Sequence, residues 1–166
     1  MAHRKIKESL TKEQLRQGHT ECLQNAKRLI EDAKLLSQHE RYRAGYIILL
    51  LASEELGKAI WLRIGQTVNA DKWQQWWRSY LSHADKQAAA ILAWAQANEL
   101  EEYEKDWRSI HRKIDKAAAR LTATREKAMY VDFETGKFVP PLEDNEIKKE
   151  FKEELAFAEW LWKWLS

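Results

Sequence analysis

The chain has 166 residues, of which 28 are basic and 26 acidic, so its formal net charge is only +2. A length of this order fits one domain that buries a core without metals or disulfides. The near balance of charges excludes a strong electrostatic field of the whole molecule that would attract nucleic acid. The single cysteine, Cys22, excludes an internal disulfide and suits a reducing cytoplasm. Nine tryptophans, with few prolines and glycines, favour helices with bulky cores or interfaces.

Two features argue against a targeting or membrane segment. The first eight residues are basic and polar and lack the apolar centre of a signal peptide. The longest apolar run, Tyr46 to Ala52, is far shorter than the roughly 20 residues that span a bilayer. We therefore expect a soluble cytoplasmic protein that does not enter a membrane.

Two long helices are predicted in the first part of the chain. Thr11-Lys12-Glu13-Gln14 has the pattern of a capping box, and apolar residues recur from there at steps of three and four. This first helix ends within 37–40. A second helix is predicted from Tyr42 to Val68, and its apolar run is typical of a helix at the centre of a bundle. Because the connection is short, the two helices should be antiparallel neighbours.

The second half predicts more helices and one small hairpin. A third helical region covers 72–97, and a fourth covers 98–124 with Asn98 as its cap. Residues 130–139 have the pattern of a β-hairpin, with Tyr130 and Phe133 packing it against the bundle. A last helix is predicted over 145–165. The expected architecture is an all-α antiparallel helical bundle forming a single domain over 1–166.

Charged residues stand inside the apolar second helix, where unpaired charge is costly. The segment reads Ser53-Glu54-Glu55-Leu56-Gly57-Lys58. A salt bridge between Glu54 and Lys58, four residues apart, is one interpretation. The other is that Glu54 or Glu55 is buried and holds a basic residue of a neighbouring helix, Arg78 or His83, in place.

The same segment resembles the AbiV family of bacterial abortive-infection proteins. The resemblance continues through a Tyr-Val-Asp segment and covers roughly Glu21 to Pro141. The residues that carry it are Asn25-Ala26, Leu29, Asp32-Ala33, Leu35-Leu36, Arg41-Tyr42, Glu54-Glu55-Leu56-Gly57-Lys58-Ala59, Tyr130-Val131-Asp132, Gly136 and Pro140. AbiV proteins look related to the HEPN superfamily of helical bundles, so the resemblance implies a HEPN-like fold with a role in antiphage defence.

Many HEPN proteins are ribonucleases in which four to six residues separate an arginine from a following histidine. This chain has that pairing in Arg78 and His83, with Lys86 following, although Ser79 stands where active members often carry Asn, Asp or His. In such a site a neutral His83 would take the 2′-hydroxyl proton of RNA as general base. Arg78 would hold the phosphate, and Lys86 would add a second positive charge to bind it.

The spacing of this motif raises a geometric question. On an unbroken helix five residues place Arg78 about 140° around the axis from His83, so the two would not share a face. Alternatively, Ser82 caps a new helix, and His83 lies in its first turn, where backbone N–H groups favour an anion. Either the helix restarts at Ser82 or the arginine reaches around it.

The sequence and the resemblance thus predict an antiphage protein, a metal-independent endoribonuclease or translation-blocking toxin with Arg78 and His83 as catalytic residues. Lys86 is the predicted substrate-binding residue, and Glu54, Glu55 and Lys58 support the site. No cofactor or metal is expected. The resemblance implies a homodimer, and the surplus of tryptophans suits such an interface. The alternative is a non-catalytic helical protein that recognises a phage or host protein partner.

Overall fold

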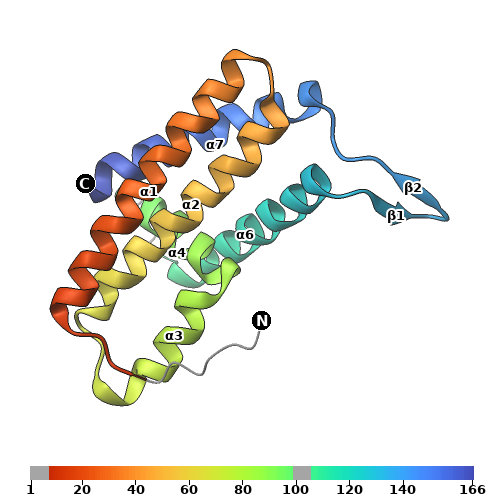
Figure 1. Ribbon diagram of the computed structural model, residues 1–166. Helices are drawn as coiled ribbons and strands as arrows, with labels where there is room; N and C mark the ends of the chain where they lie inside the picture. Colours follow the sequence, from red (N-terminus) through yellow and green to blue (C-terminus); the bar gives the residue numbers. More distant parts are fainter. Residues whose placement is uncertain (1–7, 99–105) are drawn as a thin grey trace.

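The computed structural model describes residues 8–98 and 106–166 (Figure 1). Helices dominate the described residues, which confirms the predicted all-α class. In chain order the elements are α1 (Lys12–Gln38), α2 (Tyr42–Gly65), the 3-10 turn η1 (Ala70–Lys72), α3 (Trp73–Leu81), α4 (His83–Asn98), α6 (Trp107–Met129), β1 (Asp132–Glu134), β2 (Lys137–Val139) and α7 (Asp144–Leu165).

Helix α2 is the centre of the bundle and contacts α1, α3, α4, α6 and α7. It lies antiparallel beside α1, with α7 and α6 on other sides (Figure 1). Its core residues Leu49, Leu50 and Leu56 are at most 1 % exposed. The run of apolar residues without polar interruption predicted this central position, because a helix surrounded by other helices has no solvent-facing stripe.

Helix α1 begins and ends as the sequence predicts. The Thr11 hydroxyl accepts a hydrogen bond from the Gln14 amide, and the Gln14 side chain accepts one from the Thr11 amide, which completes the capping box. After Gln38 the chain turns at Glu40, whose φ of 56° lies in the left-handed region. The short turn returns the chain directly into α2.

The third and fourth predicted helices have different boundaries in the structure. The region 72–97 is broken at Ser82, so that α3 and α4 are separate helices. The next described helix, α6, begins at Trp107 with Asp106 as its N-cap and extends past Thr124 to Met129. Asn98 ends α4 instead of capping the next helix, and its side chain donates to the carbonyl of Trp94. The predicted stretch 99–105 lies outside the described residues.

The hairpin is present, but it does not lie against the bundle. Strands β1 and β2 pair antiparallel, and Thr135 and Gly136 have the positive φ values of a tight two-residue turn. The hairpin projects away from the helices (Figure 1). Tyr130 is 57 % exposed and Phe138 76 %, so the expectation that Tyr130 anchors the hairpin was wrong. Tyr130 leaves the end of α6 in an extended conformation, which carries the following strand away from the core. The side chain of Phe133 lies outside the described part.

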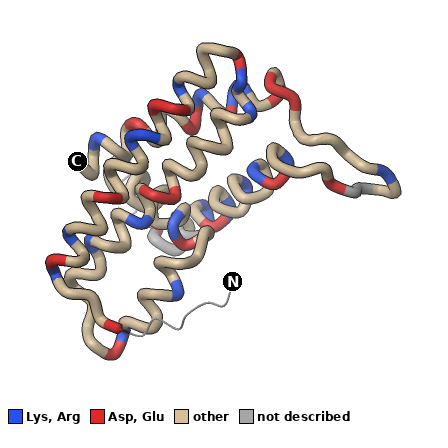
Figure 2. The backbone as a smooth tube through the Cα atoms, in the orientation of Figure 1, with Lys and Arg blue, Asp and Glu red and all other residues tan. Residues whose placement is uncertain are grey.

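Charges of both signs are spread over the helices without one continuous field (Figure 2). Along α6, basic and acidic residues alternate with apolar ones. Among residues 8–98 and 106–166, no helix combines the length and apolar character needed to cross a membrane.

Candidate functional site

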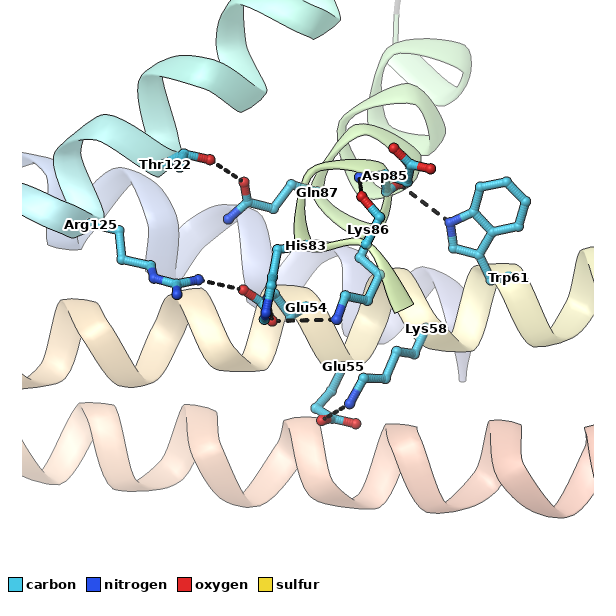
Figure 3. A network of polar contacts seen from close by, with 11 residues as sticks. Glu54, Glu55, Lys58, Trp61, His83, Asp85, Lys86, Gln87, Thr122 and Arg125 are labelled. Carbon is cyan, nitrogen blue, oxygen red and sulfur yellow. Dashed lines mark hydrogen bonds and ion pairs between the residues drawn. The ribbon is translucent and has the colours of Figure 1, made fainter. Parts of the chain in front are cut away.

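The most unusual feature of the bundle is a buried carboxylate, Glu54, that faces basic side chains from two other helices (Figure 3). Its side chain is 6 % exposed. Glu54 Oε2 lies 2.6 Å from His83 Nδ1 and 3.6 Å from Lys86 Nζ, both on α4. Glu54 Oε1 accepts a hydrogen bond of 2.8 Å from Arg125 Nη1 on α6. We call Glu54, His83, Lys86 and Arg125 the Glu54 cluster.

A glycine in α2 allows α4 to come close enough for these contacts. A Cβ atom at Gly57 would lie 2.2 Å from the backbone oxygen of Lys86. No side chain fits in that space, because the obstacle is backbone. Gly57 follows Glu54 by three residues, so the close approach occurs one turn along the helix from the carboxylate. The glycine therefore sets the spacing between α2 and α4 at the cluster.

The start of α4 is fixed by two further contacts. Ser82 has an extended backbone, and its hydroxyl accepts a hydrogen bond from the Asp85 amide, as an N-cap residue does. Trp61 Nε1 on α2 donates to the carbonyl of Asp85. His83 is consequently the first residue of α4. The restart of the helix at Ser82, one of the two geometries considered from the sequence, is confirmed.

The four members of the cluster differ in their access to solvent. The side chain of His83 is 62 % exposed and that of Arg125 is 26 % exposed, whereas Lys86 is 5 % exposed. Burial lowers the pKa of Lys86, and the neighbouring Glu54 carboxylate opposes that change. With Lys86 protonated, two cations surround one carboxylate even when His83 is neutral. The local excess of positive charge favours an anion at the exposed edge of the cluster.

The contact with Glu54 orients the His83 ring. An ionised Glu54 accepts a hydrogen bond from Nδ1–H, which selects the tautomer whose Nε2 carries the free lone pair. A histidine oriented in this way by a buried carboxylate has the arrangement that a general base requires. Its exposed ring leaves Nε2 accessible to a substrate.

The second acidic residue of the segment, Glu55, belongs to a different pair. Glu55 Oε1 lies 2.6 Å from Lys58 Nζ, and both side chains are partly exposed. The predicted Glu54–Lys58 salt bridge was therefore wrong, because the two glutamates point in different directions from α2 (Figure 3). The other interpretation, that one of them is buried and pairs with His83, is confirmed for Glu54.

Arg78 is placed on α3, on the other side of the helix break. It is exposed, and no hydrogen bond or ion pair joins its side chain to the Glu54 cluster among the described residues. Its backbone carbonyl instead accepts a hydrogen bond from the Ser82 amide. Among the described residues, the guanidinium that contacts Glu54 is that of Arg125.

Arg125 was not found from the sequence. It is one of several basic residues in α6, and its distance from Glu54 in the chain gives no indication of contact. The available signal was its position in the helix just before Tyr130-Val131-Asp132, the second segment of the AbiV resemblance. Deeper in the same α4–α6 contact, Thr122 Oγ1 donates to Gln87 Oε1 at 3.4 Å, and Gln87 is buried.

Within the part of the chain that the structure describes, no three His, Cys, Asp or Glu side chains are grouped so as to hold a metal ion. Cys22 is buried, and burial together with the nearby Glu55 raises its pKa to about 12. A thiol in that environment stays protonated and unreactive at neutral pH. Among the described residues, the candidate site at the contact between α2, α4 and α6 is therefore the Glu54 cluster.

Fold and site together define an all-α helical bundle protein with a buried carboxylate that pairs with an exposed histidine. The family model for AbiV matches residues 14–163. The chain therefore belongs to the AbiV family, and this membership implies a role in abortive infection, a form of antiphage defence. Comparison with curated proteins and with solved structures gave no match.

Proposed function

We propose that this AbiV protein is a metal-independent endoribonuclease that acts in antiphage defence. The observation that carries the proposal is the exposed His83 ring whose Nδ1 is held by the buried Glu54 beside Arg125. In the reaction, His83 Nε2 takes the proton from the 2′-hydroxyl of RNA, and that oxygen attacks the adjacent phosphorus. The bond between phosphorus and the 5′-oxygen breaks, protonated His83 returns its proton to that oxygen, and the products are a 2′,3′-cyclic phosphate and a 5′-hydroxyl end.

The basic residues have separate roles in this proposal. Arg78, exposed and without an ion pair among the described residues, binds the phosphate, as the resemblance to HEPN nucleases implies. Arg125, which already contacts Glu54, supplies positive charge beside His83. Lys86 is too buried for the direct substrate contact expected from the sequence, so we assign it the role of holding Glu54 in place.

A homodimer is part of the same proposal, because HEPN nucleases usually place two motifs in one cleft. Trp164, which is 48 % exposed, supports an aromatic contact between copies. Trp162 is less suited to a contact between copies, because its indole packs on α1 and donates a hydrogen bond to the carbonyl of Leu23. Light scattering at tens of micromolar protein measures the oligomeric state directly.

The test is cleavage of total RNA by purified protein in excess chelator. The wild-type protein should cleave, and His83→Ala should not, while melting at the wild-type temperature. His39→Ala is the matched control, because His39 is also exposed but lies at the end of α1. An unchanged rate for His83→Ala would refute the proposal.

The two arginines are separated in the same assay. Arg78→Ala should abolish cleavage, and the double variant with His83→Ala should be no worse than either single one, because groups that act on one transition state are not additive. If Arg78→Ala cleaves RNA normally and Arg125→Gln does not, the phosphate-binding role assigned to Arg78 is wrong and belongs to Arg125.

A second function, recognition of a phage or host protein without catalysis, is favoured by the projecting hairpin. Tyr130, Val131 and Phe138 are each more than half exposed there, and exposed apolar groups of this kind mark interaction surfaces. If Tyr130→Ser and Phe138→Ser abolish protection against phage while no RNA cleavage is found, this function replaces the nuclease. RNA cleavage that depends on His83 would show that protein recognition is not the sole activity.

A further inference from the structure

A cavity of about 560 Å³ lies between α2, α4, α6 and α7, apart from the Glu54 cluster. This volume is in the range of small-molecule sites, which span roughly 300–1,000 Å³. Four aromatic side chains line it: Tyr46, Trp94, Phe157 and Trp160. Aliphatic groups of Ile91 and Leu121 complete the apolar wall. The cavity can therefore enclose a flat apolar body.

The charged groups that line this cavity are mostly acidic. Three carboxyl groups, those of Glu150, Glu153 and Glu154, come from α7, and α6 contributes one base, the exposed Arg120. The lining residues of α4 carry no charge. The cavity thus has an excess of negative charge over positive charge, opposite in sign to the Glu54 cluster.

The Glu154 side chain and one carboxyl oxygen of the half-buried Glu150 are buried. Glu154 is 5 % exposed, and Ser53 donates a hydrogen bond to its Oε1. Glu150 Oε2 is buried and has no hydrogen-bond partner among the described residues. A buried carboxylate oxygen without a donor is unfavourable, and a ligand that brings a donor removes this penalty. Glu153, in contrast, is exposed and lies 3.7 Å from Lys149.

We propose that this cavity is a binding site for a primary amine that carries a flat apolar body. The ammonium group would donate hydrogen bonds to Glu150 Oε2 and Glu154, and the apolar body would pack between Trp94, Phe157 and Trp160. Aromatic faces also attract a cation, which strengthens the preference for an ammonium group over a neutral one. An anionic ligand would have only Arg120 to neutralise it against three carboxyl groups.

The ionisation of Glu154 is consistent with a cationic ligand. Burial raises the pKa of Glu154 to about 7, against the opposing effect of the Ser53 hydrogen bond. At pH 8 this carboxyl group is therefore mostly ionised. Burial and the nearby Glu154 raise the pKa of Tyr46, so its phenol stays neutral at that pH. A bound ammonium ion would favour the ionised form of Glu154.

Isothermal titration calorimetry with tryptamine at pH 8 tests the proposal, and indole-3-acetate serves as the matched anion. Both probes carry the same ring, so their difference reports the charge preference. Tryptamine should bind at least ten-fold more tightly than indole-3-acetate. Equal affinity, tighter binding of the acid, or no binding of tryptamine at millimolar concentration would overturn the proposal.

Variants locate the binding in the cavity. Glu150→Gln should weaken tryptamine binding at least five-fold, whereas Glu126→Gln, the same change at an exposed position of α6, should not alter it. Arg120→Gln should leave tryptamine binding equal or tighter, because it removes a like charge. Equal affinities for Glu150→Gln and Glu126→Gln would refute this location. The measurement uses no RNA, so its failure leaves the nuclease proposal intact, and failure of the nuclease leaves the amine site intact.

Discussion

Replacing Glu54 by glutamine removes the charge on which the cluster depends, while keeping the size and polarity of the side chain. Lys86 would then be a buried ammonium, 5 % exposed, without the carboxylate that is its ion-pair partner among the described residues. Breaking a buried ion pair from one side typically costs 3–5 kcal/mol. Since glutamine still offers a carbonyl oxygen to Arg125 and Lys86, we expect the lower end, about 3 kcal/mol. For a chain of this length that corresponds to a fall in melting temperature of about 6–12 °C.

Thermal and urea unfolding of the variant measure this difference. Glu55→Gln is the matched control, because the Glu55–Lys58 pair is partly exposed and should contribute no more than about 1 kcal/mol. Adding Lys86→Met to Glu54→Gln should recover part of the loss, since the unpaired ammonium is then gone. Two results would show that this carboxylate does not hold the cluster together. One is a Glu54→Gln variant with the melting temperature of the wild type. The other is a double variant in which Lys86→Met lowers stability by as much as it does alone in the wild type.

Two further predictions concern packing and pH. Gly57→Ala should lower the free energy of unfolding by about 2 kcal/mol, because its Cβ meets the backbone of α4. Gly18→Ala, whose Cβ would contact only side-chain carbons of Leu62, at 3.3 Å or more, should be neutral or stabilising in the same melts. Equal effects of the two substitutions would contradict the argument. The raised pKa of Glu154, about 7, makes the wild type lose stability as pH rises from 4.5 through 7. The free energy of unfolding of Glu154→Gln should therefore match that of the wild type near pH 5. Near pH 8 it should exceed the wild-type value by up to about 3 kcal/mol. Urea unfolding at both pH values checks this, and parallel pH profiles would refute it.

The helices that the sequence predicted best are those with strong local signals. The capping box at Thr11 and the apolar run from Tyr46 are local patterns, and both gave the right element. Between α3 and α4 the propensities are continuous, so the break at Ser82 was one of two open geometries. The hairpin was recognised from its turn, but its packing depends on where α6 ends, which the local pattern did not give.

For the cluster, the sequence singled out Glu54, His83 and Lys86, and a buried glutamate was one of its two interpretations of the charged segment. It could not decide which glutamate, because Glu54 and Glu55 are neighbours on a helix that is enclosed on most sides. The direction of each side chain follows from the positions of α1, α4 and α6 around α2. The pairing of Glu55 with Lys58 is a consequence of that arrangement.

By itself the sequence determined the helical class, the central position of α2 and the AbiV family, since these depend on periodicity, composition and motif. Only the tertiary structure decided that Arg125, far away in the chain, joins Glu54 while Arg78 remains outside the cluster. The physical reason is that contact between helices depends on their crossing and spacing, here set by Gly57 against the Lys86 backbone. The close approach of α4 to α2 brings together residues that are far apart in the chain, so no local sequence pattern indicates their contact.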